Sequence, residues 1–335
     1  MNERGSTHSS LHASTLTCQP KPYPQRQAIL VLGMHRSGTS AVSGVIHALG
    51  VAGPKTLAPP TEWNPRGFFE SPRIFSAYDE LLAAAGSRWD DWRQLEPQRF
   101  GAAAEERRSK LVQLFAEEFG GAPLIYVKDP RMCRFVPFVG AILAELGYAI
   151  VAVLPIRKPL EVAFSLQRRD KLALSRSVLM WLRHVLDAEF NSRHMPRCFI
   201  SYEDLLGDWR RQMRRLAAKT GLRWPDASNK SEATIDGFLS ADLHRERASA
   251  AATEARAAVV PLAETAYGIL LEIINSGDSQ TLRDRLDTLR DRFNDACRTF
   301  EPAVAEMEAA NARLTAECDR LRTELDRLAA NNKTS

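Results

Sequence analysis

A glycine-rich loop follows an apolar run near the start of the chain, in the segment AILVLGMHRSGTS at residues 28–40. Gly33, four further residues and Gly38 reproduce the glycine spacing of the phosphate-binding loop G-x-x-x-x-G-K-[ST]. A strand, a glycine loop and a helix start gather backbone N–H groups around one anion. The amides and hydroxyls would come from Ser37, Gly38, Thr39 and Ser40. The segment therefore predicts a phosphate site rather than a plain strand-to-helix turn.

The loop departs from an ATP-binding loop at one position that matters for chemistry. Thr39 stands where the lysine that reaches the β- and γ-phosphates belongs, and a cation occurs earlier, at Arg36. Asp129 follows an apolar run and could imitate the acid that holds magnesium, but its neighbours in KDPR are cationic. A nucleotide kinase of modified sequence is therefore the alternative interpretation, not the first one.

A second anion-binding pattern lies far along the chain, in IRKPLEVAFSL at residues 156–166. Arg157 ends an apolar run, Pro159 suits the first turn of a helix, and Ser165 lies about two turns further on. A guanidinium fork and a hydroxyl can bind one dianionic phosphate. A solvated arginine and a core-facing serine would be the plainer interpretation. Together, the two patterns predict a nucleotide phosphorylated at both ends of its ribose.

The segment GMHRSGTS resembles the 5'-phosphosulfate loop of the sulfotransferases, in which a Lys or Arg precedes SGT, and IRKPLEVAFSL resembles that family's 3'-phosphate motif. The resemblance covers about residues 28–216. It implies 3'-phosphoadenosine 5'-phosphosulfate (PAPS) as the sulfuryl donor, a hydroxylated acceptor and no metal. The carbohydrate-type and bacterial members are the most similar, so a glycan or glycolipid is the expected acceptor. The donor-binding residues that it implies are His35, Arg36, Ser37, Gly38, Thr39, Ser40, Arg157 and Ser165.

Two catalytic residues follow from the same resemblance. Arg36 would stabilise the leaving phosphate electrostatically, because arginine does not deprotonate in proteins. Glu70, in the segment WNPRGFFES, would be the base that accepts the proton of the acceptor hydroxyl, since this segment is similar to the NPxGYFE-like element of bacterial relatives. A solvated glutamate at a helix start is the plainer alternative. Other candidates for the base are Asp129, His35 and Asp90.

Further polar and aromatic residues fit a binding cleft less specifically. Lys128, Asp129 and Arg131 would either line the cleft or seal a strand end as ion pairs. The acceptor could stack on tryptophans, which more often anchor a core or a lid. These tryptophans are Trp63, Trp89 and Trp92, with the carboxylates of WDDW beside the last two. Arg168 and Arg169 could reinforce the nucleotide phosphate or be merely solvated.

Four short apolar runs read as buried parallel strands: residues 28–33, 124–127, 149–156 and 198–202. Helical patterns separate them at residues 40–49, 102–119, 136–146 and 175–190. This alternation predicts an α/β domain, a doubly wound parallel sheet of P-loop-like type flanked by helices, over residues 28–275. Ligands of such sheets bind beyond the carboxyl ends of the strands, where the motifs above lie.

Composition narrows the class and the compartment. The 335 residues are 44% hydrophobic with a net charge of only +4, which argues neither for nucleic acid nor for a membrane surface. The five cysteines are scattered and form no metal-ligand pattern, which favours a reducing compartment. Residues 1–27 are expected to be a disordered leader, and no apolar run reaches the length of a membrane span. We expect a cytoplasmic protein without a metal.

The last part of the chain, residues 276–335, has the composition of a coiled coil. A seven-residue repeat runs through Phe300, Met307, Leu314, Leu321 and Leu328, and the alternate seam holds Val304, Asn311, Cys318 and Leu325. Pro302 predicts a break before the regular part. We expect homo-oligomers joined through residues 300–330, with Asn311 favouring a parallel dimer; an amphipathic helix packed on the domain is the alternative. A non-catalytic scaffold acting through this coil is the third functional hypothesis.

Overall fold

The computed structural model describes residues 26–239 and 261–331, and its centre is a parallel four-stranded sheet. The strands are β1 (Gln27–Val31), β2 (Leu124–Lys128), β3 (Ala149–Ile156) and β4 (Arg197–Ser201), in the order β2-β1-β3-β4. All four expected strands are confirmed to within two residues at either end. The expected leader lies almost entirely outside the described residues.

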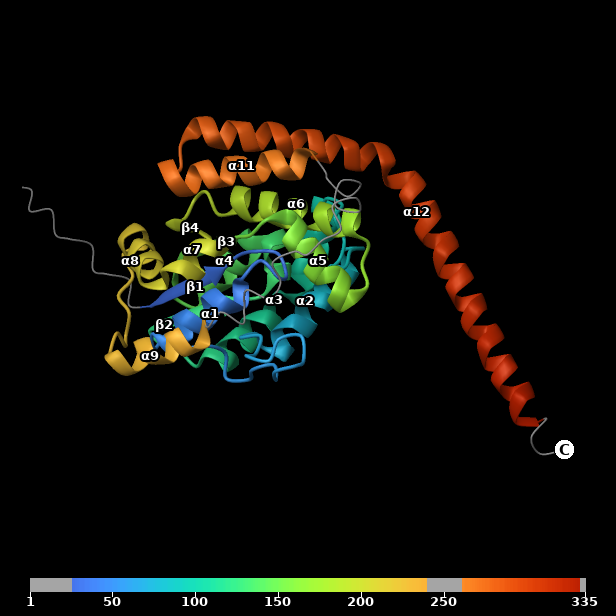
Figure 1. Cartoon of the computed structure of the whole chain (residues 1–335), viewed down its shortest axis with the longest axis horizontal. Coiled ribbons are helices and arrows are strands. Elements are labelled where there is room, and N and C mark those ends of the chain that lie inside the picture. The colour runs from blue at the N-terminus through green and yellow to red at the C-terminus, as the bar shows by residue number, and fades with distance from the viewer. Residues whose placement is uncertain (1–25, 240–260, 332–335) are drawn as a thin grey trace, which may run out of the picture.

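The two faces of the sheet are both covered by helices, so the doubly wound architecture is confirmed (Figure 1). Side chains of β1 alternate between two apolar clusters: Ala28 and Leu30 pack into one, Ile29 and Val31 into the other. The second cluster includes α1 (Thr39–Ala48), α7 (Tyr202–Gly207), α8 (Trp209–Thr220) and α9 (Asn229–Phe238). A strand buried on both faces explains the continuous apolar runs in the sequence.

The first and larger cluster contains the remaining helices that pack on the sheet. These are α2 (Pro72–Ala84), α3 (Pro97–Phe119), α4 (Val136–Glu145), α5 (Pro159–Asp170) and α6 (Leu174–Asn191), with the 3₁₀ helix η1 (Pro130–Phe135). The sequence analysis did not place α2, although its start has a clear local cause. Ser71 caps it by accepting a hydrogen bond from Ile74 N, and Pro72 occupies the first turn.

Two further helices are α11 (Pro261–Ser276) and α12 (Gln280–Asn331). In Figure 1, α11 and the first part of α12 lie antiparallel against one another at the edge of the domain. The first part of α12 belongs to the larger cluster through its buried apolar side chains. These are Leu282, Leu286, Leu289, Phe293 and Cys297. The packed core therefore includes the first part of the region that the sequence assigned to the tail.

Beyond its packed part, α12 turns away from the domain, so that its own C-terminal end at Asn331 lies far from the sheet (Figure 1). The break expected at Pro302 is wrong, because α12 continues through this residue. Proline removes one helical hydrogen bond and favours a kink, but the bonds on either side can still hold one helix. Leu328 lies on α12, and its side chain is outside the described residues. No helix in the described ranges is long and apolar enough to cross a membrane.

Candidate active site

The loop between β1 and α1 presents an open helix N-terminus. Gly38 precedes α1 with φ 91°, and no side chain caps the first turn of the helix. Beside it, the buried Ser37 hydroxyl has no hydrogen-bond partner within the described structure. A Cβ at Gly38 would overlap the ring of Tyr202, so only glycine fits there. Open N–H groups, an unsatisfied hydroxyl and the positive end of α1 suit a phosphate group.

The two anion-binding patterns of the sequence meet at this loop. Arg36 Nε donates a 2.6 Å hydrogen bond to Ser165 Oγ on α5, and Arg157 donates from Nη1 to the Arg36 carbonyl at 3.1 Å. The two patterns come together because they follow β1 and β3, which are adjacent parallel strands with their carboxyl ends at the same edge of the sheet. Arg157 is further held by Glu161, at 3.1 Å from Nε, and its guanidinium stacks on the Tyr202 ring at 4.6 Å. The patterns therefore form one site.

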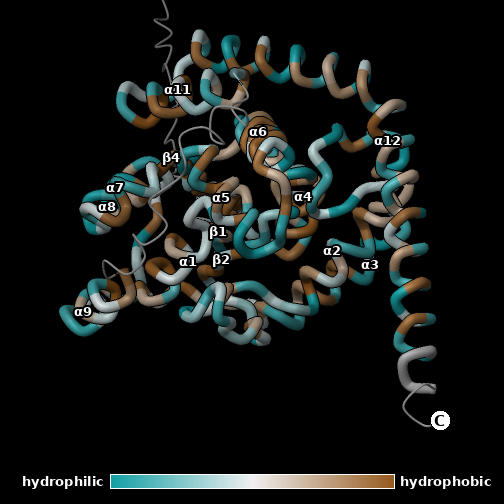
Figure 2. The backbone as a smooth tube through the Cα atoms, turned by 45° about the vertical axis from the view of Figure 1, so that its right-hand side comes forward, coloured by the Kyte–Doolittle hydropathy of each residue, from teal (hydrophilic) through white to brown (hydrophobic). Residues whose placement is uncertain are grey.

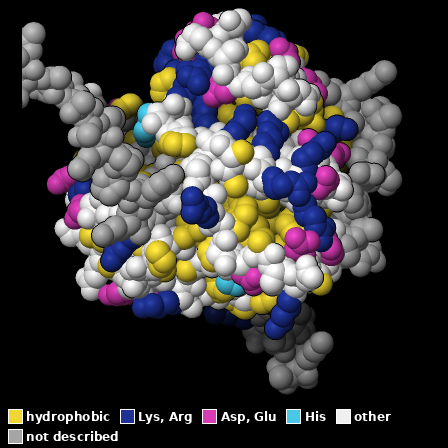
Figure 3. Space-filling view, turned by 90° about the vertical axis from the view of Figure 1, so that its left-hand side faces the viewer, with side chains coloured by type: hydrophobic (Ala, Val, Ile, Leu, Met, Phe, Trp, Pro, Cys, Tyr) yellow, Lys and Arg dark blue, Asp and Glu magenta, His cyan; other side chains and the backbone are white. Residues whose placement is uncertain are grey.

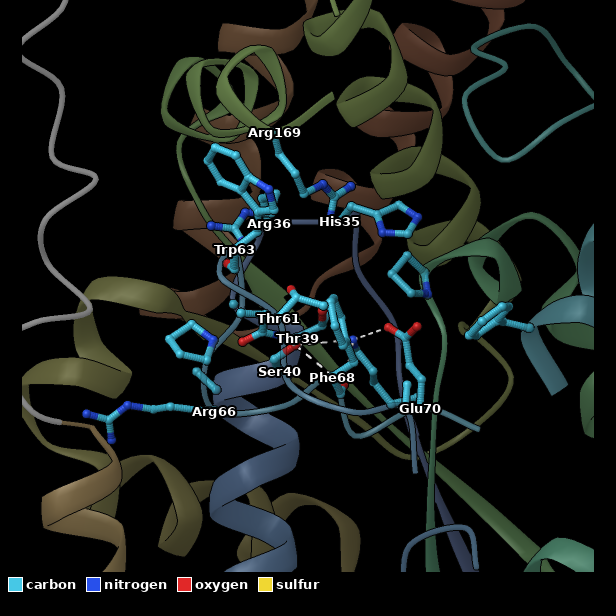
Figure 4. A pocket seen from close by; sticks show the side chains of 18 of the residues that line it. His35, Arg36, Thr39, Ser40, Thr61, Trp63, Arg66, Phe68, Glu70 and Arg169 are labelled. Carbon is cyan, nitrogen blue, oxygen red and sulfur yellow. Dashed lines mark hydrogen bonds and ion pairs between the residues drawn. The ribbon is translucent and has the colours of Figure 1, made fainter. Parts of the chain in front are cut away.

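A cavity of about 840 Å³ opens beside the loop and is lined mainly by cations and aromatic rings (Figure 4). Of the expected donor-binding residues, all but Ser37 and Ser165 line it; these two are buried behind the wall. Seven cationic side chains and two carboxylates line this cavity. The cations are Arg36, Arg66, Lys128, Arg131, Arg157, Arg168 and Arg169, and the carboxylates are Glu62 and Glu70. Figure 3 shows Lys and Arg gathered beside an apolar area on one face of the molecule. Such a cavity favours a polyanionic ligand.

Glu70 reaches the cavity from the segment before α2 and is almost fully buried. Its carboxylate forms an ion pair with the ammonium group of Lys128, at the end of β2, as the dashed line to Glu70 in Figure 4 marks. Lys128 Nζ also donates to Phe68 O at 3.0 Å and to Ser40 Oγ at 3.3 Å. A solvated glutamate at a helix start is therefore excluded. Through Lys128, this ion pair links Glu70 to Ser40 in the first turn of α1.

His35 is a partly buried, neutral member of the same wall. Burial, followed by the positive charges of Arg169 and Arg131, lowers the pKa of His35 well below its ordinary value. Its ring packs edge-on against Trp89, with 5.0 Å between centroids, and Nε2 has no hydrogen-bond partner in the described part of the chain. His35 thus forms part of the apolar side of the cavity rather than adding a charge to it.

Asp129 lies just behind the cavity, at the carboxyl end of β2. It begins η1 by accepting a 2.9 Å hydrogen bond from Arg131 N, and it forms an ion pair with the Arg131 guanidinium at 3.2 Å. Burial raises the pKa of Asp129 to about 6, against the opposing effect of Arg131. Arg131 also pairs with Asp79 at 2.6 Å and stacks over the ring of Phe75, where it lines the cavity. The strand end is therefore both sealed by ion pairs and part of the cleft.

The segment that contains both anion-binding patterns is also the one that resembles a known protein family. A sequence profile described as the sulfotransferase family matches residues 28–226, the segment that contains the sheet, the loop and both anion-binding patterns. The chain belongs to the sulfotransferase family. Among curated proteins, none matches this sulfotransferase.

Solved structures similar to this sulfotransferase include two sulfotransferase domains and one further sulfotransferase. The sulfotransferase domain of the Synechococcus PCC 7002 olefin synthase is 16% identical, with a TM-score of 0.37, over 73% of this chain and 97% of that one. The sulfotransferase domain of the curacin biosynthetic pathway is 14% identical, with a TM-score of 0.37, over 69% and 95%. Sulfotransferase STF1 of Mycobacterium tuberculosis H37Rv is 13% identical, with a TM-score of 0.36, over 64% and 71%.

The WDDW segment of the sulfotransferase contributes less to the cavity than its composition suggests. Trp89 lines the cavity, whereas Trp92 packs on Phe293 of α12 at 6.4 Å between ring centroids. Asp90 pairs with Arg176 at 3.0 Å and is not among the residues that line the cavity. The next residue, Asp91, pairs with Arg93. These carboxylates form ion pairs that hold the loop and do not line the cavity.

Two cavity residues of the sulfotransferase were missed by the sequence analysis. Tyr202 follows the last strand, and its ring packs on both Gly38 and Arg157. Its position at the end of the fourth apolar run was the available signal. Arg66 donates to the carbonyls of Gly237, at 2.7 Å, and Phe238, so it ties the loop before α2 to α9. This contact joins distant segments and left no local pattern in the sequence.

Proposed function

We propose that this sulfotransferase moves a sulfuryl group from PAPS to a hydroxyl of a carbohydrate acceptor, a glycan or glycolipid. The observation that carries the proposal is the meeting of the two anion-binding patterns. Arg36 contacts Ser165, and Arg157 contacts the Arg36 carbonyl, so guanidinium groups from both patterns converge on one loop. A donor with phosphates on both the 3' and 5' positions of its ribose matches such a pair of clamps.

The donor half of the site suits a polyanion. The uncapped start of α1, with Gly38, Thr39 and Ser40 in the cavity wall, would hold the 5'-phosphosulfate. Arg157, together with the Ser165 hydroxyl, would hold the 3'-phosphate, because a planar fork donates two parallel hydrogen bonds to a phosphate. The absence of a lysine at Thr39 fits a donor that carries no γ-phosphate.

Catalysis then consists of positioning and charge stabilisation. The acceptor oxygen attacks sulfur, the bond from sulfur to the bridging oxygen breaks, and 3',5'-ADP leaves with the electron pair. Arg36 is held by Ser165 and, through Nη1, by the carbonyl of Trp63 at 3.0 Å, so its charge is fixed before the reaction begins. Glu70 is the group that accepts the hydroxyl proton. Lys128 positions Glu70 through their ion pair.

The acceptor half of the cavity supports a sugar. Trp63 and Trp89 line it, and aromatic faces stack on the C–H groups of sugar rings. The polar side chains of Thr61, Glu62 and Asn64 also line it and can hydrogen-bond hydroxyl groups. Apolar platforms beside dispersed polar groups suit a hydroxylated ring better than a purely aliphatic alcohol.

The test is transfer of labelled sulfate by the purified full chain. PAPS carrying ³⁵S is incubated with a panel of extracted glycans and glycolipids and, in parallel, with aliphatic alcohols and phenols. The proposal expects label in a carbohydrate and an equal amount of 3',5'-ADP, and neither with the Arg36→Ala variant. Label only in the non-carbohydrate acceptors would overturn the acceptor class. Absence of 3',5'-ADP with every acceptor, together with hydrolysis of ATP, would overturn the proposed reaction.

We also propose that the enzyme works in the cytoplasm and that residues 300–330 join copies of it. Cys133, Cys198 and Cys297 are buried and free, which suits a reducing compartment. The apolar side chains of α12 beyond its packed part are exposed, which suits a contact with another helix.

A further inference from the structure

The C-terminal part of α12 exposes the apolar stripe that its first part buries. Leu286, Leu289 and Phe293 are at most 5% exposed against the domain. On the same helix, five large apolar side chains are 46–71% exposed: Phe300, Met307, Leu314, Leu321 and Leu325. Figure 2 shows the apolar positions recurring along the free part of the helix. An isolated helix is marginally stable in water, so a long helix with an apolar stripe needs a partner surface.

The spacing of the stripe identifies the partner as another helix of the same kind. Positions separated alternately by four and three residues form the a and d positions of a heptad repeat. Leu314 and Leu321 occupy d positions, and Asn311 occupies an a position. Leucine at d favours two strands, and a single asparagine at a fixes the register of a parallel pair.

The flanking charges complement one another in the same arrangement. Glu317 occupies a g position, and Arg322 the e position five residues later. In a parallel, in-register pair, each g residue faces the e residue of the following heptad on the other strand. In the described part of one chain, Glu317 pairs with the exposed Arg320 at 2.7 Å, and Arg322 lies 3.8 Å from Asp319. Exposed ion pairs of this type contribute little to stability. The side chains of Glu317 and Arg322 can therefore pair with a second helix instead, with little loss of free energy.

We propose that residues 300–328 of α12 form a parallel, in-register, two-stranded coiled coil with a second copy of this chain. Asn311 then faces Asn311 of the partner subunit, and Glu317 faces Arg322 of the partner subunit. Cys318, at the next a position, faces Cys318 of the partner subunit across the seam. Both catalytic domains lie at the same end of the coil, because both helices leave their domains in the same direction.

Cys318 makes the register directly measurable, because it is the exposed cysteine among those described. The test uses the full chain with Cys18→Ser, so that residue 18, outside the described ranges, cannot react. A short bis-maleimide adds one thiol to each of its two double bonds, with no leaving group, and joins two Cys318 thiols only when they lie close together. The matched control carries Cys318→Ser as well.

The proposal expects light scattering to give twice the mass of the single chain at micromolar concentration, and the reagent to link most of the protein into covalent dimers. The control should remain a non-covalent dimer that is not linked. Leu314→Asp with Leu321→Asp should raise the dimer dissociation constant by about 100-fold or more, with unchanged thermal stability of the domain, because both side chains are exposed in the single chain. A monomer or trimer mass would overturn the proposal. A dimer that is not linked through Cys318 would overturn the parallel register.

Discussion

Arg36 Nε donates a 2.6 Å hydrogen bond to Ser165 Oγ, although the two residues are 129 positions apart in the chain. The guanidinium lies in the loop after β1 and the hydroxyl on α5 after β3, and the carboxyl ends of these adjacent parallel strands bring them together. Arg36, the proposed stabiliser of the leaving phosphate, is thereby fixed to a residue of the proposed 3'-phosphate pattern. In the proposed donor complex, one connected set of side chains would bind the phosphates at both ends of the ribose.

Removal of Arg157 is expected to weaken donor binding. Arg157→Ala loses the charge-assisted fork, so the dissociation constant of 3',5'-ADP should rise about 10- to 100-fold by calorimetry. Arg210→Ala is the matched control, since Arg210 forms exposed pairs with Glu232 and Asp236 away from the cavity. Equal affinity in the wild type and the Arg157 variant would remove this residue from the site.

Removal of Arg36 is expected to act on turnover more than on binding. Arg36→Ala should lower kcat about 100- to 1000-fold, because the charge that stabilises the leaving group is lost. The dissociation constant of 3',5'-ADP should change less than about tenfold, since the amides of α1 and Arg157 remain. Arg36→Lys keeps the positive charge but not the planar guanidinium, so its kcat should lie between those of the wild type and Arg36→Ala. A large loss of affinity with unchanged kcat would contradict the role in the chemical step.

Glu70 and Asp129 can be distinguished as bases by a matched pair of variants. Glu70→Gln should lower kcat about 100-fold or more, with nearly unchanged affinity for 3',5'-ADP, because Glu70 lines the cavity. Asp129→Asn should have a smaller effect, since Asp129 lies behind the wall and pairs with Arg131. Steady-state kinetics and thermal melts of both variants check this. The reverse order of effects on kcat would transfer the role of base to Asp129.

The glycine at the start of α1 provides a test of the loop's shape. Gly38→Ala forces a Cβ against the Tyr202 ring at φ 91°, whereas Gly147→Ala has a similar φ of 82° in open space. The control should therefore lose about 1 kcal/mol of unfolding free energy from backbone strain alone. Gly38→Ala should lose more and should bind 3',5'-ADP more weakly. Equal unfolding free energies and intact affinity would show that the contact with Tyr202 does not shape the site.

Local patterns were sufficient to predict the sheet and the glycine loop between β1 and α1, because buried strands and helix starts have strong sequence signals. The apolar runs, the glycine spacing, Arg157 and Ser165 are such signals. Partners brought together by the fold were not predictable. The ion pair of Glu70 with Lys128 and the pairing of Asp90 with Arg176 depend on loops whose course no periodicity encodes. The helix that continues through Pro302 overrides a local breaker in the same way.

A buried histidine gives the domain a predictable pH dependence. Burial, and then the charge of Arg134, lowers the pKa of His184 to about 3, from 6.5 in the unfolded chain. The unfolded chain therefore binds a proton that the folded domain excludes below pH 6.5. The contribution of His184 to the free energy of unfolding is therefore complete above pH 6.5. It decreases as the pH falls towards 3, by up to about 1.4 kcal/mol per pH unit.

The variant His184→Leu should remove this contribution. Its unfolding free energy, from urea titrations at pH 7, 6 and 5, should fall less steeply with decreasing pH than that of the wild type, by up to one proton's slope. The leucine cannot titrate and can fill the apolar surroundings of the ring. Parallel curves for the two proteins would contradict the exclusion of the proton.

The central claim is that one site reads both phosphates of a PAPS-type nucleotide. Calorimetric titration of the full chain with 3',5'-ADP, with 5'-AMP and with ATP plus magnesium tests it most directly. The account predicts that 3',5'-ADP binds at least about tenfold more tightly than either of the others, because only it engages both Arg157 and the start of α1. Tight binding of ATP with magnesium, together with weak binding of 3',5'-ADP, would contradict it.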